Sequence, residues 1–371
     1  MPTLRSPVVR DEPAAGARRV ERLDAVVIGG GQAGLATGHH LAAHDLDFVI
    51  LDGAGRVGDA WRRRWDSLRL FTPAAHSGLP GMRFPAAPGH LPDKDEMAEY
   101  LERYAERFDL PVRLHTRVTS LGFDGERFVA RAGARVLEAH SVIVATGPFQ
   151  VPRIPALSSR LAAEIHQLHS SEYRNPFELP DGPTLVVGAG NSGAQIALEL
   201  ARHRQVWLAG RDTARLPRRF LGRDVFDWAW PVLARASVDT RLGRRLRERA
   251  RRGDALVGIH PREFASMRIV RTGPVSDTRD GMPVADGVTI APRVIVWCTG
   301  FRPDYGWIDL PIFDAAGDPR HRRGVVSEQP GLHFVGLPFQ SSRTSALIGG
   351  VGADAAFVAA QVARRAELAC A

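Results

Sequence analysis

Cysteine is scarce in this chain. Among 371 residues there are two cysteines, Cys298 and Cys370, and they form no C-x-x-C pair. This spacing disfavours a structural zinc site or a dithiol redox centre and is typical of a reducing cytoplasm. The 13 histidines include no H-x-x-x-H with a supporting acid, so we expect no metal site. We therefore expect a cytoplasmic protein without a metal.

Lysine is almost absent as well. Lys94 is the only one, so 48 of the 49 basic residues are arginine, and the net charge is +8. A skew this strong indicates the codon usage of a GC-rich genome rather than a binding surface. The sequence shows no basic stripe with interleaved aromatic residues. We therefore expect no nucleic-acid partner, although a positive field favours anionic cofactors.

Long apolar runs are also missing. A membrane span needs roughly 18 uninterrupted apolar residues. The nearest candidate, ALIGGVGADAAFVAAQVA, contains Asp354 and is better interpreted as a core helix, so we expect no stable membrane insertion. The first residues, 1–22, are rich in Arg, Pro and Ala and lack the apolar segment of a secretory signal. They are predicted to be a disordered tail.

Two glycine-rich turns dominate what is present. The first follows a buried parallel strand, Ala25 to Ile28, and opens a helix. In a G-x-G-x-x-G turn the first glycine permits the tight turn, the second lets the backbone approach a pyrophosphate, and the third allows close helix–strand packing. A second strand, DFVILD, ends in Asp52, an acid placed to accept hydrogen bonds from ribose hydroxyls. The predicted dinucleotide-binding residues of this turn are Gly29, Gly31, Gln32, Ala33 and Gly34.

The second turn repeats the construction after the strand TLVV. Its predicted cofactor-binding residues are Gly188, Gly190, Asn191, Ser192 and Gly193. The residue 23 positions after Gly188 is Arg211, whereas the residue 23 positions after Gly29 is Asp52. Aspartate repels a ribose 2′-phosphate and arginine attracts it. The first site should therefore hold a dinucleotide with free ribose hydroxyls, and the second should hold NADPH.

A hydride donor together with a separate dinucleotide acceptor implies a flavin, so we predict FAD in the first site. Two further apolar strands end in Thr-Gly, at Thr146-Gly147 and Thr299-Gly300, where the chain passes between domains. These four residues are predicted to contact cofactor. We expect an α/β fold of two Rossmann-like, three-layer dinucleotide-binding domains, with an FAD domain over 23–155 plus 300–371 and an inserted NADPH domain over 156–299.

The paired turns, together with ATGPF and WCTGF, resemble the flavin-dependent (class B) monooxygenase superfamily from about residue 23 onward. The resemblance is strongest to small bacterial members labelled FAD-dependent NAD(P)H oxidoreductases. The segment GDAWRRRWDSLRLFTPA resembles the one in which Trp61 would pack near the flavin. HTRVTSL resembles the strand whose backbone, at Val118, contacts the FAD adenine. GLHFVGLPFQSSRTSALIGGVGADAAFVA resembles the closing flavin segment, in which a helix N-terminus points at the isoalloxazine.

The resemblance implies hydride transfer from NADPH to FAD, then O2 activation and oxygenation of a small soft nucleophile at N or S, or of a 2-oxo acid. One departure from the family pattern lies in its fingerprint, and another is that FTPAAHSGLP offers no clear equivalent of the asparagine that the animal enzymes carry near the flavin. The family fingerprint keeps His169 and Tyr173 here, but Ala163 and Ile165 replace its Phe and Gly. An NADPH:acceptor reductase or NADPH oxidase without oxygen transfer is therefore a second hypothesis, and a non-catalytic flavin-binding redox sensor is a third.

No catalytic pair is visible in the sequence. Asn191, which would face the nicotinamide or phosphate in the family, and Arg343, which could meet an anionic substrate, are the candidates. A helical insertion is predicted at about 214–262, where an aromatic amphipathic stretch precedes an arginine-rich helix. It could cap the substrate channel, touch a membrane surface, or pack as a hairpin on its own domain. A homodimer is left open.

Overall fold

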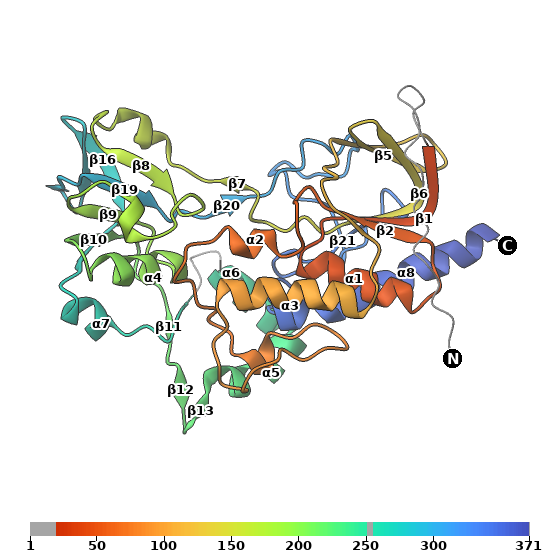
Figure 1. The fold of residues 1–371 in the computed structure, drawn as a ribbon, viewed down its shortest axis with the longest axis horizontal. Coiled ribbons are helices and arrows are strands. Elements are labelled where there is room, and N and C mark those ends of the chain that lie inside the picture. Colours follow the sequence, from red (N-terminus) through yellow and green to blue (C-terminus); the bar gives the residue numbers. More distant parts are fainter. Residues whose placement is uncertain (1–19, 251–254, 371) are drawn as a thin grey trace, which may run out of the picture.

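The structure is a computed structural model that describes residues 20–250 and 255–370, which form two α/β units joined by crossing strands (Figure 1). The predicted tail, residues 1–22, lies outside the described residues as far as residue 19. Its last three residues are not a tail, because strand β1 begins at Val20. Val20 to Leu23 pair in parallel with Val136 to Ala139, and this pairing carries the strand beyond its predicted start.

The first unit is built on a seven-stranded sheet in the order β3-β2-β1-β6-β5-β4, with β21 paired to β6. β3, β2, β1, β6 and β21 run parallel, whereas β5 and β4 are antiparallel additions. The strands are β1 (Val20–Ile28), β2 (Phe48–Leu51), β3 (Val112–Arg113), β4 (Ser120–Phe123), β5 (Phe128–Ala132), β6 (Arg135–Val144) and β21 (Leu332–Phe334).

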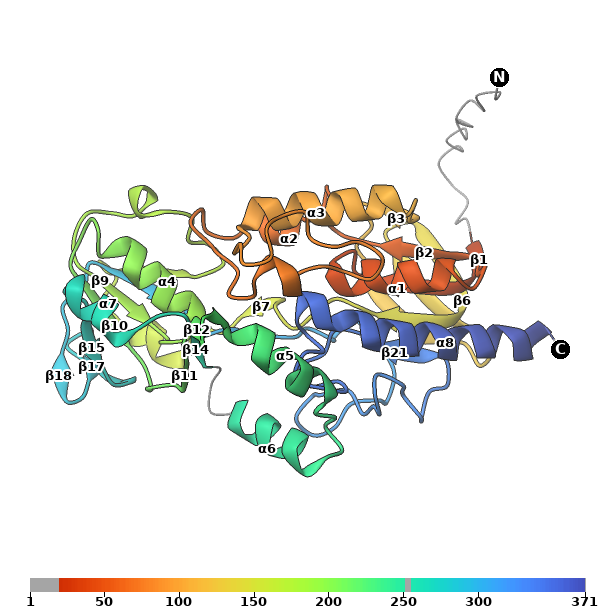
Figure 2. The same cartoon turned by 90° about the horizontal axis from the view of Figure 1, so that it is seen from below.

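Both faces of this sheet are covered, which explains the unbroken apolar run of β1. Ala25 and Val27 belong to a core shared with the helices, whereas Val26 and Ile28 belong to a core closed by β4, β5 and the segment before β21. α1, α3 and α8 pack side by side (Figures 1 and 2). The helices are α1 (Gln32–Ala42), α2 (Asp59–Arg62), α3 (Lys94–Arg107) and α8 (Val351–Cys370), with the 3-10 turns η1 (Ala74–His76) and η4 (Ile348–Gly350).

The second unit is built on a five-stranded parallel sheet in the order β15-β10-β9-β19-β8. Helix α4 (Asn191–Leu200) packs on β9 and β10, and a three-stranded meander, β16-β17-β18, contributes to the core on the other face. The strands are β8 (His166–His169), β9 (Thr184–Val187), β10 (Val206–Ala209), β15 (Val270–Thr272), β16 (Val275–Arg279), β17 (Met282–Ala285), β18 (Val288–Thr289) and β19 (Val294–Trp297), with η2 (Ala156–Arg160) and η3 (Pro176–Glu178).

The chain crosses between the units twice, on the antiparallel pair β7 (Val151–Pro152) and β20 (Phe301–Arg302). All strands of the second sheet therefore fall between β6 and β21 of the first. The predicted fold class, two Rossmann-like units with the second inserted in the first, is confirmed. Between β10 and β15, where the sequence predicts a helical insertion, lie β11 (Arg215–Leu216), β12 (Arg219–Phe220), β13 (Arg223–Asp224), α5 (Val225–Arg235), α6 (Arg241–Ala250), β14 (Leu256–Val257) and α7 (Pro261–Ser266).

Candidate functional site: two dinucleotide cradles on one cleft

The two glycine turns have almost the same backbone geometry. Gly29 and Gly188 have φ values of 112° and 111°, a left-handed conformation that favours glycine. A Cβ on Gly34 would lie 1.8 Å from the Gly29 carbonyl oxygen, and one on Gly193 would lie 1.8 Å from the Gly188 oxygen. The third glycine of each turn is therefore required for helix–strand packing, as the spacing predicts.

Each turn leaves the start of a helix free for an anion. Gly31 caps α1 and Gly190 caps α4, neither helix has a side-chain cap, and neither has an acidic residue in its first turn. A Cβ built on Gly31 or Gly190 would meet no atom within 4 Å. The start of each helix is thus open at its capping glycine, at the positive end of a helix dipole, which is the arrangement that binds phosphate.

The two cradles differ at the residue that follows the strand beside each turn, β2 in the first unit and β10 in the second. Asp52 follows Leu51, and its carboxylate accepts hydrogen bonds from the backbone N–H groups of Gly30 (2.7 Å) and Ala54 (2.8 Å). Each carboxylate oxygen keeps further lone pairs, and Asp52 lines the cleft, so it can also accept hydrogen bonds from the hydroxyls of a bound ribose.

In the second cradle the corresponding position is not Arg211, as the sequence count predicts, but Gly210. Leu51 pairs with Ile28 directly before the first turn, and Ala209 pairs with Val187 directly before the second. The link from the second turn to its strand is one residue shorter, so an equal count places Arg211 one residue too far. A Cβ on Gly210 would lie 2.8 Å from the Ala189 nitrogen, so the second cradle has no room for an acid there.

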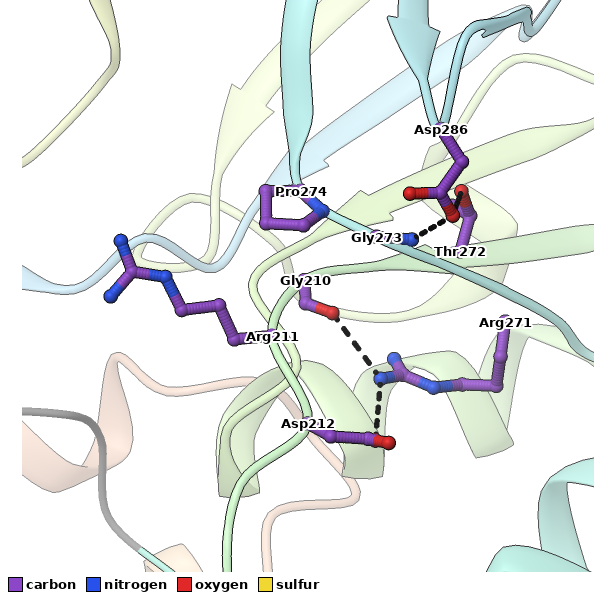
Figure 3. A pocket seen from close by; sticks show the side chains of 8 residues that line it. All are labelled: Gly210, Arg211, Asp212, Arg271, Thr272, Gly273, Pro274 and Asp286. Carbon is purple, nitrogen blue, oxygen red and sulfur yellow. Dashed lines mark hydrogen bonds and ion pairs between the residues drawn. The ribbon is translucent and has the colours of Figure 1, made fainter.

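Arg211 instead lines a separate pocket of 330 Å³ beyond the ends of β10 and β15 (Figure 3). Arg271 in this pocket is tied down, because it donates to the carbonyls of Leu208 and Gly210 and pairs with Asp212 at 3.4 Å. Asp286 accepts from Thr272 and Gly273, and these hydrogen bonds lower the pKa of its carboxyl. Figure 3 shows Arg211 extending away from both acids, and it makes no ion pair with any residue that the structure describes.

Residues of both cradles line one cleft of 660 Å³. The cleft runs from Gly31 and Asp52 in the first unit to Asn191 and Gln195 at the start of α4. Gln195 closes one side, because its side chain exchanges two hydrogen bonds with the backbone of Arg69, 3.2 Å and 3.0 Å long. The predicted cofactor residues that line this cleft are Gly29, Gly31, Gln32, Ala33, Asp52, Trp61, Val118, Thr146, Gly147, Asn191 and Ser192.

Other predicted residues lie elsewhere. Gly34, Gly188, Gly190 and Gly193 shape the turns without lining the cleft. Thr299 donates to the Arg153 carbonyl, and the Gly300 carbonyl accepts from Arg153 and contacts the His169 ring. The Thr-Gly pair of the second crossing therefore joins strands rather than contacting the cleft.

The side chains of the two catalytic candidates are both engaged by other groups of the protein. The Asn191 amide donates to the Ala255 carbonyl at 3.0 Å and accepts from the Val257 N–H at 3.0 Å. Its side chain thus fastens β14 to the start of α4. Arg343 does not line the cleft, and its guanidinium lies over the Phe339 ring at 5.2 Å. This structural role of Asn191 could not be predicted from the sequence, because its hydrogen-bond partners lie 64 and 66 residues away.

The fingerprint residues His169 and Tyr173 are also structural. His169 is fully buried between Ser171 and the Gly300 carbonyl, and burial lowers the pKa of its ring. The Tyr173 hydroxyl donates to Glu199 at 2.8 Å, and burial raises its pKa. Neither residue lines the cleft.

Arg64 is a cleft residue that sequence reasoning missed. Its guanidinium lies 5.3 Å from the ring centre of Phe301 and 5.8 Å from that of Phe149, near the crossing strands. Burial and the neighbouring Arg174 lower its pKa, and it makes no ion pair with a described carboxylate. The buried Thr146 hydroxyl and the Trp65 indole N–H of the lining also have no hydrogen-bond partner among the described residues. These groups suit a polar, anionic ligand.

Neither a metal-binding cluster nor a membrane-spanning helix is found in the described part of the chain. Within residues 20–250 and 255–370 no group of three or more His, Cys, Asp or Glu side chains could hold a metal ion. In the same residues no helix is both long and apolar enough to cross a membrane.

Comparisons with known proteins agree with this geometry. Residues 26–222 match the pyridine nucleotide-disulphide oxidoreductase family. A CzcO-like oxidoreductase of Geobacillus kaustophilus is 42% identical over 91% of this chain and 97% of its own. The indole-3-pyruvate monooxygenase YUCCA4 of Oryza sativa is 28% identical over 84% of this chain and 82% of its own.

Among solved structures, a flavin-containing monooxygenase from Stenotrophomonas maltophilia is 30% identical, with a TM-score of 0.74 over 95% of this chain and 100% of that one. Its alignment spans both units described above. The chain therefore belongs to the pyridine nucleotide-disulphide oxidoreductase family, as a flavin monooxygenase-like oxidoreductase.

Proposed function

We propose that this protein is an FAD- and NADPH-dependent monooxygenase acting on a small soft nucleophile at nitrogen or sulfur, or on a 2-oxo acid. One observation carries the proposal. The cradle at the start of α1 and the cradle at the start of α4 open on the same cleft, so two dinucleotides bound in the two cradles would meet within it. A hydride can pass only between rings held in contact, and this shared cleft supports such an encounter.

The first cradle fits FAD. The free start of α1, the open space at Gly31 and the Asp52 carboxylate match a pyrophosphate and a ribose with free hydroxyls. The unpartnered Thr146 hydroxyl offers a further polar contact in the same lining. When bound, FAD supplies a ring that accepts hydride and reacts with oxygen.

The second cradle fits NADPH rather than NADH. A site for NADH usually offers an acid to the ribose 2′-hydroxyl, and here Gly210 stands at that strand end against Ala189. Arg211, which pairs with no acid among the described residues, lies one residue further in its own pocket, where a 2′-phosphate would supply a counter-charge.

The residues of the chain bind, orient and exclude water rather than transfer protons. The wall of the cleft includes Trp61, Trp65, Phe71, Leu347 and Ile348, which keep the reacting region apolar. Among the described lining residues, the acids are Asp52 and Asp304 and there is no histidine to pair with them. This lining agrees with a reaction in which the cofactor carries the chemistry.

The structure weakens the sequence argument for an oxidase or reductase. The two departures from the fingerprint, Ala163 and Ile165, do not line the cleft, and Ile165 is buried in the core of the second unit. A disulphide reductase working through its own dithiol lacks support too, because Cys298 and Cys370 are the only cysteines. Burial raises the pKa of the Cys298 thiol to about 12, which disfavours the nucleophilic thiolate form.

The test is a stoichiometry. The flavin-loaded protein is reduced with NADPH without oxygen, and oxygen is then admitted with a panel of amines, sulfides and 2-oxo acids. A monooxygenase yields one oxygenated product per NADPH with at least one compound class, and little hydrogen peroxide. One hydrogen peroxide per NADPH with every compound would replace the proposal with an NADPH oxidase. Failure of NADPH to reduce the flavin would favour the third hypothesis, a non-catalytic redox sensor.

A further inference from the structure

The segment between β10 and β15 carries an exposed apolar surface that the proposed reaction does not use. Figure 1 shows the β12–β13 hairpin and α5 projecting at the lower edge of the molecule, and Figure 2 shows α5 and α6 uncovered from that side. Of the 13 large apolar side chains exposed in the described residues, six lie here. These six, Leu216, Phe220, Leu221, Trp228, Val232 and Leu242, define the apolar tip.

The turn of the β12–β13 hairpin holds a leucine in a strained backbone conformation. Leu221 and Gly222 connect β12 to β13 with φ values of 50° and 78°, so both are left-handed. Asparagine or glycine fits such a turn, whereas leucine is strained in it. Leu221 is nevertheless 76% exposed, and Phe220 beside it is 54% exposed. Folding gains nothing from a strained, solvated leucine, which indicates a surface that becomes covered.

The outer face of α5 continues this surface. Trp228, Val232 and Arg235 follow one another at helical spacing and are exposed. The Trp228 indole donates to the Phe220 carbonyl at 3.1 Å, which joins helix and hairpin. Arg223 lies over the Trp228 ring at 5.9 Å. Tryptophan flanked by arginine is typical of side chains at the level of lipid headgroups.

The same segment concentrates positive charge. Residues 213–250 contain ten arginines and four acids, a net charge of +6 out of +8 for the whole chain. On α6, Arg241, Arg245 and Arg249 share one face at four-residue spacing. All three are exposed, and none makes an ion pair with a described residue.

We propose that the apolar tip and the arginines of α6 form a peripheral docking surface for an anionic lipid bilayer. Charge complementarity selects this partner. A second copy would bring another +6 segment on a chain with only +2 elsewhere, so two copies would repel. A nucleic acid would use the arginines but not exposed leucine and valine. An anionic membrane satisfies both, with charge at its surface and apolar depth beneath it.

The docking surface also lies beside the cleft. The inner face of α5 packs on the cleft wall, where Phe226 stacks on Phe71 with ring centres 6.2 Å apart. Arg218 donates to the Phe71 carbonyl at 2.8 Å, and Trp230 stacks on His76 at 4.7 Å. Membrane contact would therefore place the wall that carries Phe71 close to the lipid.

The experiment is co-sedimentation of the flavin-loaded protein with vesicles of phosphatidylcholine alone or mixed with phosphatidylglycerol. We expect binding to the anionic vesicles only, weakening as salt is raised. Leu221→Ser and Phe220→Ser should each weaken binding about tenfold or more, because each removes an apolar side chain from lipid. Arg245→Gln should weaken it about fivefold.

Matched controls separate this from general stickiness. Phe177 is 81% exposed outside this segment, and Phe177→Ser should leave vesicle binding unchanged. Circular dichroism and flavin content should match the parent protein for all four variants. Absence of binding to anionic vesicles would overturn the proposal. So would a concentration-dependent dimer that Leu221→Ser dissociates, or binding to DNA that Leu221→Ser leaves intact.

Discussion

The substitution Gly31→Ala separates a cofactor cradle from a turn that merely folds. Gly31 has φ −79° and ψ −172°, extended backbone that alanine adopts freely. Its added Cβ would meet no protein atom within 4 Å, so the ligand-free protein should lose no stability and could gain a few tenths of a kcal/mol from reduced chain entropy.

The same methyl group would stand where the pyrophosphate approaches the start of α1. Displacing the phosphate weakens about two charge-assisted N–H bonds, at about 1.5 kcal/mol each. FAD affinity of the apoprotein should therefore fall about a hundredfold. The assay is quenching of FAD fluorescence on titration with apoprotein, alongside chemical unfolding of the same apoprotein.

Two controls sharpen the comparison. Gly89 also has open space at its Cβ but lies in an exposed loop, so Gly89→Ala should change neither quantity. Gly34→Ala brings a Cβ to 1.8 Å from the Gly29 oxygen and should destabilise the fold itself. Unchanged FAD affinity in a stable Gly31→Ala protein would refute the assignment of the first cradle.

Three further predictions follow from the other residues. Arg211→Ala should lower kcat/KM for NADPH about tenfold or more, and Arg211→Lys should restore part of it, with NADH unaffected by either; equal losses with both nucleotides would remove the 2′-phosphate assignment. Asn191→Ala should lower the free energy of unfolding by about 2 kcal/mol through two lost hydrogen bonds, yet leave kcat within about twofold; a selective collapse of kcat would instead make Asn191 catalytic. Burial lowers the pKa of the His333 ring from 6.5 to about 4, so the unfolded chain binds a proton at a higher pH than the folded one. Stability is therefore complete above pH 6.5, and about 3 kcal/mol of it is lost as the pH falls toward 4. The free energy of unfolding should depend less on pH across this window in His333→Leu, and identical slopes would contradict the burial argument.

The sequence predicted what local geometry determines. Each glycine turn needs a strand before it and a helix after it, and spacing alone places Gly29, Gly34, Gly188 and Gly193 in the observed roles. Asp52 was found for the same reason, since it follows directly on the paired strand end.

What the sequence could not predict depends on register and on distant partners. The count that equates Arg211 with Asp52 assumes links of equal length, and a link one residue shorter moves Gly210 into that place. Asn191 is held by backbone groups more than sixty residues away, and the Arg64 guanidinium lies over Phe301, which belongs to the crossing strand β20 far along the chain. None of these pairings leaves a periodic signal.

The most direct test of the shared cleft is a crystal structure of the protein grown with FAD and NADP+ together. The account predicts FAD with its pyrophosphate at the start of α1, NADP+ with its pyrophosphate at the start of α4, and the 2′-phosphate beside Arg211. FAD in the cradle of Gly188 to Gly193, or nucleotide density in one cradle alone at saturating concentrations of both, would contradict it.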